Sequence, residues 1–258
     1  MSDYVPEFHA GLLTIPRNLK SAIETCRHLA SRGFPEPEIF ENTPVVNPTS
    51  IDQVHRNIFE GHFAILERFY TKRLPANRRL HLLVFEDDAC AVSWAQLRLF
   101  DLVRDKVSYL ERHYPNWSVL NLGCASMGPV LPVGNGLVMA AAPYSVHAYV
   151  VNGRKAGTIC KMTRKICKRP LYPEGCSVFP FSERFALFRP LLTQTRLPKE
   201  FIFKNIPLVR DVLTYERTML GLMVISSLAP LVVLMGIGVA CYTLVNRMRL
   251  VAKQKREE

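Results

Sequence analysis

Short apolar runs alternate with stretches of helical periodicity along most of this chain. Strands are predicted where the apolar residues are continuous or alternate with polar ones, at 10–15, 38–42, 81–85, 118–123 and 145–151. Helices are predicted where apolar residues recur at every third or fourth position, at 19–32, 50–69, 94–114 and 153–167. Because strands and helices alternate, the pattern predicts an α/β domain with a mostly parallel sheet and helices on both faces.

Two stretches between these elements are typical of irregular structure. Pro and Gly become frequent between residues 170 and 190, which predicts a loop region. The glycine pair in Gly134-Asn135-Gly136 predicts a turn.

One uninterrupted apolar stretch lies near the C-terminal end. No charged residue occurs between Thr218 and Asn246, and this length exceeds the roughly 20 apolar residues that cross a bilayer as a helix. The pattern therefore predicts one transmembrane helix at 218–246, followed by a basic tail at 247–258. It predicts a single-pass membrane protein, which in a eukaryotic cell indicates the endoplasmic reticulum or Golgi. Basic residues flank both ends of the stretch, so the side of the membrane that holds the body stays open.

The remaining residues, 1–215, are enough for one α/β domain with a sizeable core. Seven cysteines are scattered without the close pairs typical of zinc sites. The formal net charge is +11, and seven of the basic residues lie between Arg154 and Arg169 without an acid among them. This segment fits a solvated helix face, a surface on anionic lipid or a phosphate site. Nucleic-acid binding is not expected, because aromatic stacking residues are not interleaved with these charges.

Three consecutive acids, Glu86-Asp87-Asp88, follow the apolar strand predicted at 81–85. Carboxylates this close repel one another unless a cation offsets them, and their hard oxygens suit Mg²⁺ or Mn²⁺. Such acids also occur simply as caps of the next helix. In open α/β sheets, ligands bind beyond the carboxyl ends of the strands. The acids therefore favour a metal-bound diphosphate at this edge, and no P-loop or nucleophile-elbow motif indicates another site.

The segment Val84-Phe85-Glu86-Asp87-Asp88-Ala89 resembles the central motif of glycosyltransferase family 25, which contains lipopolysaccharide and procollagen galactosyltransferases. Three further segments agree with that family in order and spacing: Gly61-His62, Leu120-Asn121-Leu122-Gly123, and the Ala-Tyr segment from His147 to Ala156. The resemblance covers residues 10–194. Only the acidic strand and the Ala-Tyr segment are specific to the family.

The resemblance implies a GT-A-like, nucleotide-sugar-binding mixed sheet flanked by helices. It also implies a UDP-sugar donor and a divalent metal, usually Mn²⁺ with Mg²⁺ as the alternative. By this resemblance Glu86 and Asp88 match the acids that bind metal and diphosphate. The other candidates for the donor site are Arg17, His62, Asp87, His147 and Tyr149. A single His or Tyr on an apolar element is more often packed as part of the core than used in a site.

The chain also departs from the family pattern. The family's Asp-Arg pair after the first strand is reduced to Arg17, and its Pro-x-Asp has no counterpart in the segment from Pro170 to Cys176. Inverting transfer needs a carboxylate that takes the proton of the acceptor hydroxyl. Glu174 and Glu183 are the two candidates for this base, and both also fit ordinary surface acids.

The sequence as a whole predicts a membrane-anchored glycosyltransferase. It would transfer a hexose, most simply galactose, from UDP to a hydroxyl on a glycan, lipid or protein. The alternative is an inactive, glycosyltransferase-like membrane protein that acts as a binding or recruitment module, which the departures from the family motifs favour.

Overall fold

The computed structural model describes most of the N-terminal three quarters of the chain. The described residues are 5–42, 51–73, 80–92, 98–123, 125–126, 130–140, 143–144, 147–166 and 180–194, together with Leu228 and Tyr242. The predicted domain boundary at residue 215, the tail at 247–258 and almost all of the stretch at 218–246 lie outside these residues.

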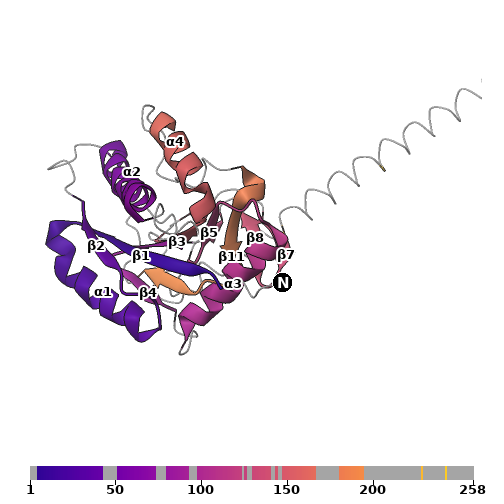
Figure 1. Ribbon diagram of the computed structural model, residues 1–258, viewed down its shortest axis with the longest axis horizontal. Coiled ribbons are helices and arrows are strands. Elements are labelled where there is room, and N and C mark those ends of the chain that lie inside the picture. Colours follow the sequence, from indigo (N-terminus) through magenta and orange to yellow (C-terminus); the bar gives the residue numbers. More distant parts are fainter. Residues whose placement is uncertain are drawn as a thin grey trace, which may run out of the picture.

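An eight-stranded mixed sheet forms the centre of the fold (Figure 1). Its order is β2 (Glu38–Glu41), β1 (Glu7–Thr14), β3 (Leu80–Glu86), β10 (Ala148–Val151), β5 (Val119–Asn121), β11 (Arg184–Leu187), β8 (Leu137–Ala140) and β7 (Val130–Gly134). Two small sheets add β4 (Ala89–Ala91) paired with β12 (Leu192–Gln194), and β6 (Ala125–Ser126) paired with β9 (Pro143–Tyr144).

The predicted mixed sheet is confirmed, but the prediction that it is mostly parallel is wrong. Strands β2, β1 and β3 are parallel, as are β5 and β11, whereas β10, β8 and β7 join the sheet by antiparallel pairing. Parallel neighbours need a long crossover, usually a helix. The described residues between β5 and β10 form only strands and turns, so the chain returns there in the opposite direction.

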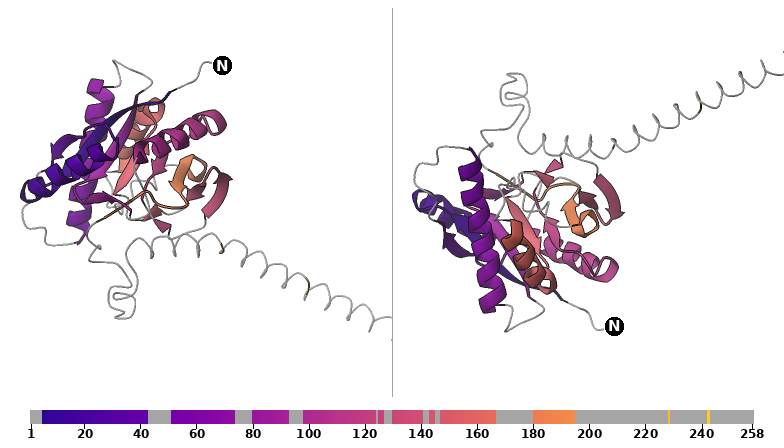
Figure 2. Two further views of the ribbon diagram at one scale, coloured as in Figure 1. Left: turned by 90° about the horizontal axis from the view of Figure 1, so that it is seen from below. Right: turned by 90° about the horizontal axis from the view of Figure 1, so that it is seen from above.

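Four helices cover the two faces of the sheet. Helices α1 (Leu19–Ser31) and α3 (Leu99–His113) lie on one face, and α2 (Ile51–Arg68) and α4 (Ala156–Ile166) lie on the other (Figure 1). The view from above in Figure 2 has α2 and α4 side by side over the sheet. All four of these helices were predicted from the sequence. Helix α3 begins at Leu99 rather than at residue 94. Residues 93–97 are outside the described ones.

Each face of the sheet has its own apolar core, and the alternation of β3 explains why. Leu83 and Phe85 pack with α1 and α3, whereas Leu82 and Val84 pack with α2 and α4. Successive side chains of a strand point to opposite faces, so a strand buried on both faces reads as a continuous apolar run. This is why the run at 81–85 predicted the central strand.

The structure describes residues 134–136 and 180–190 of the two segments that were predicted as irregular. Gly134-Asn135-Gly136 forms the predicted turn, between β7 and β8, and all three residues have positive φ, at 96°, 50° and 67°. The prediction of a loop throughout 170–190 is wrong at its end, where β11 lies inside the sheet with Phe185 fully buried. Residues 167–179 are outside the described ones.

The predictions of a transmembrane helix and of a single-pass membrane location are corrected. Among the described residues, every helix is too short or too polar to cross a membrane. The longest of them, α2, has 18 residues and includes five charged ones, each of which is costly inside a bilayer.

Candidate functional site

The acidic turn, defined as Glu86, Asp87 and Asp88, lies where three strand ends meet. Leu13 of β1 is in register with Glu86 at the end of the parallel strand β3. The Glu86 N–H donates to the carbonyl oxygen of His147, directly before β10, over 2.9 Å. Asp87 and Asp88 then turn the chain into β4. The acids therefore lie at the carboxyl edge of β1 and β3, which is where ligands collect in sheets of this kind.

Glu86 points toward the face covered by α2. Its Oε1 lies 3.2 Å from Nε2 of His62, and Nδ1 of His62 lies 3.0 Å from the hydroxyl of Tyr149 on β10. Only 17% of the His62 side chain and 26% of the Glu86 side chain are exposed. Three residues that the sequence places far apart are therefore joined in one chain of contacts that ends at the acidic turn.

Gly61 allows α2 to come this close to the sheet. A Cβ at Gly61 would lie 2.8 Å from the Leu13 side chain and 2.9 Å from Nδ2 of Asn42. Both distances are shorter than ordinary van der Waals contacts. A larger residue at position 61 would require the side chains of Leu13 and Asn42 to move, so the glycine lets α2 lie close to the sheet without that rearrangement.

Asp87 points the other way, toward α1. Its Oδ2 accepts a hydrogen bond of 2.7 Å from the hydroxyl of Thr14, the last residue of β1. Its main-chain carbonyl oxygen accepts two more, from Ser21 over 3.1 Å and from Thr25 over 2.8 Å. The alternation along β3 continues into the turn, so that Glu86 and Asp87 have partners on opposite faces of the sheet.

The three hydroxyl residues were missed by the sequence analysis. Thr14 ends a strand parallel to β3, so its position beside the acids was foreseeable from the strand pattern. Ser21 and Thr25 are four residues apart and therefore share one face of α1, but nothing in the sequence indicates that this face meets Asp87.

Asp88 is the third acid of the turn, and its side chain is partly exposed. Among the described residues, no group of three or more His, Cys, Asp or Glu side chains could hold a metal ion. Mg²⁺ is commonly held by one or two carboxylates plus the phosphates of a substrate. A site formed by Glu86 and Asp88 would be of that second kind, in which the ligand completes the coordination.

His147 and Gly123 complete the edge beside the turn. His147 is fully buried at the start of β10. A Cβ at Gly123, just after β5, would lie 2.1 Å from the carbonyl oxygen of Leu192 and 2.5 Å from Nε2 of His147. The glycine is thus required for β5, β10 and the segment leading to β12 to meet here.

The remaining predicted site residues lie in different places. Arg17 is exposed in the 3-10 turn Pro16–Asn18, which follows β1 at the same edge as the acids. Glu183 precedes β11 and contacts the Ser118 hydroxyl and, over 3.5 Å, Nζ of Lys155. Because Arg184 is in register with Val119 at the start of β5, Glu183 lies at the opposite edge of the sheet. Glu174 is outside the described residues.

The basic segment is partly neutralised by neighbouring acids. Arg154 pairs with Glu111 of α3, and Lys155 pairs with Glu183. Lys161 of α4 is exposed. Among the side chains of this segment that the structure describes, Arg154 and Lys155 are therefore engaged within the fold.

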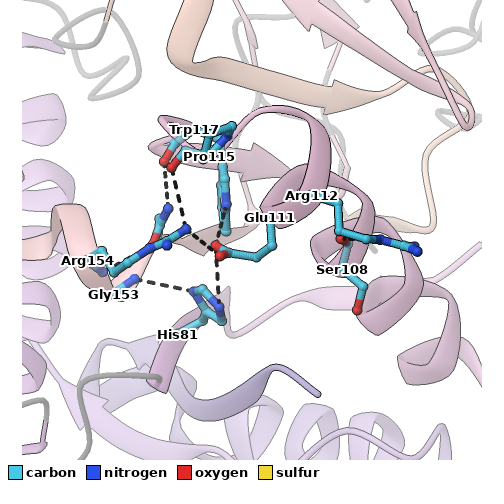
Figure 3. Close-up of polar contacts among 9 residues, drawn as sticks. His81, Ser108, Glu111, Arg112, Pro115, Trp117, Gly153 and Arg154 are labelled. Atoms are coloured by element: carbon cyan, nitrogen blue, oxygen red, sulfur yellow. Dashed lines mark hydrogen bonds and ion pairs between the residues drawn. The ribbon is translucent and has the colours of Figure 1, made fainter. Parts of the chain in front are cut away.

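Arg154 belongs to a polar cluster that the sequence analysis did not find (Figure 3). The cluster lies at the sheet edge opposite the acidic turn, because His81 is at the start of β3 and Glu86 is at its end. Arg154, Trp117 and His81 converge on Glu111, whose side chain is only 8% exposed. The indole N–H of Trp117 donates to Glu111 over 2.8 Å. The N–H of Gly153 donates to Nδ1 of His81 over 3.4 Å.

Burial of the imidazole, with a contribution from the charge of Arg154, lowers the pKa of His81 to about 3. His81 is therefore neutral at pH 7. Its Nε2 lies 3.9 Å from Glu111, which is too long for a hydrogen bond and is not an ion pair in this state. The cluster therefore contributes to the packing and stability of the fold. The one sign of it in the sequence is a histidine at the start of an apolar strand.

Comparisons with known proteins give limited information. No protein-family model matches the sequence, and a search of curated proteins also finds no match. Among solved structures, the fold is similar to a glycosyltransferase involved in the glycosylation of the major capsid of PBCV-1. The TM-score is 0.33 and the identity is 10%, over 62% of this chain and 68% of that one. A likeness at this TM-score and identity indicates no function for this chain.

Proposed function

We propose that this protein is a glycosyltransferase that transfers a hexose, most simply galactose, from a UDP-sugar to a hydroxyl acceptor with the help of Mn²⁺ or Mg²⁺. The observation that carries the proposal is the acidic turn at the carboxyl edge of β1 and β3. Its support from the sequence is the resemblance of the segment 84–89 to family 25.

In this proposal Glu86 and Asp88 hold the cation, and the diphosphate of the donor completes its coordination. The cation would offset the charge that develops on the departing UDP. Arg17, exposed at the same edge, supplies a further positive charge for the phosphates. His147 is buried beside the turn, where its carbonyl oxygen accepts the hydrogen bond of the Glu86 N–H.

The reaction is a displacement at the anomeric carbon of the sugar. The acceptor hydroxyl oxygen forms the new bond, the bond to the diphosphate oxygen breaks, and UDP leaves with the electron pair. A base takes the hydroxyl proton. Glu174 remains the candidate for that base, whereas the position of Glu183 at the opposite edge leaves it without a part in the proposal.

Binding of the donor is tested by thermal melting of the purified chain with UDP and Mn²⁺. A ligand present at about 100 times its dissociation constant stabilises the folded state by roughly 2.7 kcal/mol, which raises the melting temperature by about 5–10 °C in a domain of this size. Chelation of the metal should remove the shift. No shift at millimolar UDP and Mn²⁺ contradicts the donor site and favours the alternative, a non-catalytic binding protein.

Turnover is tested by release of UDP from UDP-galactose and other UDP-hexoses. Asp88→Asn keeps the size of the side chain and removes its charge, so release should fall about 100-fold or more, as expected when a charge at the leaving group is lost. The matched control is Asp101→Asn, which changes an exposed carboxylate that pairs with Arg104 on α3. Full activity of Asp88→Asn removes the proposed role of that residue.

A further inference from the structure

The acidic turn is held from both sides by side chains that need not touch a ligand. On the α2 side the contacts run from Tyr149 through His62 to Glu86. On the α1 side, hydroxyl groups donate to the carboxylate and the main-chain carbonyl of Asp87. Glu86 and Asp87 are therefore held by side chains on opposite faces of the sheet.

The direction of the hydrogen bonds on the α2 side follows from the chemistry of the groups. An ionised carboxylate only accepts hydrogen bonds, so Nε2 of His62 carries the proton that Glu86 receives. In the neutral imidazole the other nitrogen is then an acceptor, and the hydroxyl of Tyr149 donates to it. In this arrangement the contacts with Glu86 and Tyr149 together favour the tautomer with the proton on Nε2, and the contact with His62 orients the Glu86 carboxylate.

The α1 side restrains the main chain itself. Two hydroxyl groups, four residues apart on α1, converge on the carbonyl oxygen of Asp87. The Thr14 hydroxyl binds the Asp87 carboxylate over 2.7 Å. The Asp87 carboxylate is therefore turned toward Thr14 of β1, and its carbonyl oxygen toward α1.

We propose that His62, Tyr149 and Thr25 are positioning residues: they hold the acidic turn in the shape that lets Glu86 and Asp88 bind a cation together, while Asp87 anchors the turn. This inference rests on the proposed function. It gives His62, Asp87 and Tyr149 a role different from contact with the donor. Groups that orient metal ligands typically change metal affinity by 10–100-fold when they are removed.

The test measures the affinity of the full chain for Mn²⁺ in the presence of UDP, from the electron paramagnetic resonance signal of free Mn²⁺. His62→Phe keeps the ring shape and removes both hydrogen bonds, so the affinity should fall 10–100-fold. His62→Gln keeps a donor and an acceptor and should restore most of it. Thr25→Val should weaken binding about ten-fold, with Thr25→Ser as the matched variant that keeps the hydroxyl. Melting temperatures without ligand identify any variant that fails to fold.

Each outcome has one meaning. Native affinity in folded His62→Phe and Thr25→Val overturns the positioning role while leaving the metal site in place. Equal loss in all four variants, including His62→Gln and Thr25→Ser, also overturns it, because the hydrogen bonds would then not be the cause. Absence of Mn²⁺ binding by the native chain overturns the proposed function and this role with it.

A measurement without metal examines the hydrogen bonds alone. Nitrogen-15 chemical shifts of the His62 imidazole distinguish a protonated nitrogen from a bare one. The expected state is a protonated Nε2 and a bare Nδ1, and Tyr149→Phe should reduce the population of that state. A proton found on Nδ1 in the native chain overturns the proposed direction of the contacts, whatever the result with Mn²⁺.

Discussion

Replacing His81 by Gln should change how the stability of this protein depends on pH. The imidazole is 2% exposed and lies between the rings of Phe8 and Trp117, at centroid distances of 5.7 and 5.4 Å. Burial lowers its pKa from 6.5 to about 3. The folded protein therefore holds a neutral imidazole throughout the pH range in which the unfolded chain becomes protonated.

The sign and size of the effect follow from this difference. Because the folded pKa is the lower one, the contribution to stability is complete above pH 6.5 and is lost progressively as the pH falls toward 3. Each pH unit below 6.5 removes about 1.4 kcal/mol. Between pH 7 and pH 5, His81 alone should therefore lower the free energy of unfolding by about 2 kcal/mol.

The assay is urea unfolding of the native chain and of His81→Gln at pH 7 and pH 5. His9 and His28 also have lowered pKa values, chiefly through burial, and they add to the pH dependence of both proteins. The difference between the two pH dependences isolates His81. Gln retains an acceptor for the Gly153 N–H, so the variant should fold.

The control is Trp117→Phe, which removes the hydrogen bond to Glu111 and leaves the imidazole in place. Because Trp117 is fully buried, the variant should lose about 2 kcal/mol at both pH values, from the missing hydrogen bond and from the space that the smaller ring leaves, and it should keep the native pH dependence. If His81→Gln loses as much stability between pH 7 and pH 5 as the native chain does, the reasoning is refuted. The imidazole would then not be buried in its neutral form.

Three further substitutions test the packing of the fold, each by urea unfolding at pH 7. Gly123→Ala should cost about 2–4 kcal/mol or prevent folding, because its methyl group would meet the main-chain oxygen of Leu192 at 2.1 Å. Gly157→Ala is the matched control, because its methyl group would meet only the movable ring of Tyr70, at 2.8 Å. This control should lose little stability, or gain up to about 1 kcal/mol from helix propensity. Equal losses in the two would contradict the close approach at Gly123. Phe185→Ala should cost about 3–5 kcal/mol, since the ring is fully buried, and a loss below about 1 kcal/mol would place residue 185 outside the core.

The sequence predicted the elements whose pattern is local. The apolar run at 82–85 became the centre of β3 because a strand covered by helices on both faces buries successive side chains in both cores. The position of Glu86, Asp87 and Asp88 at the carboxyl edge also followed from this strand. The amphipathic pattern likewise located α1, α2, α3 and α4, because each buries one side against the sheet.

The tertiary structure alone decided how distant segments meet. The stretch containing β11 reads as a loop because it is short and lies close to Pro and Gly residues, yet pairing with β5 and β8 makes it part of the core. Strand propensity depends on neighbours that a sequence pattern does not specify. The reversed direction of β10 has the same origin, since pairing partners are chosen in space.

The candidate site divides in the same way. The chain itself specified three acids after a strand and a histidine on the helix before it. The fold decided that Glu86 meets His62 and Tyr149 on one face while Asp87 meets Thr14 and Thr25 on the other. Local patterns arise from forces between residues near in sequence, whereas these contacts exist only because packing brings α1, α2 and β10 to the same edge of the sheet.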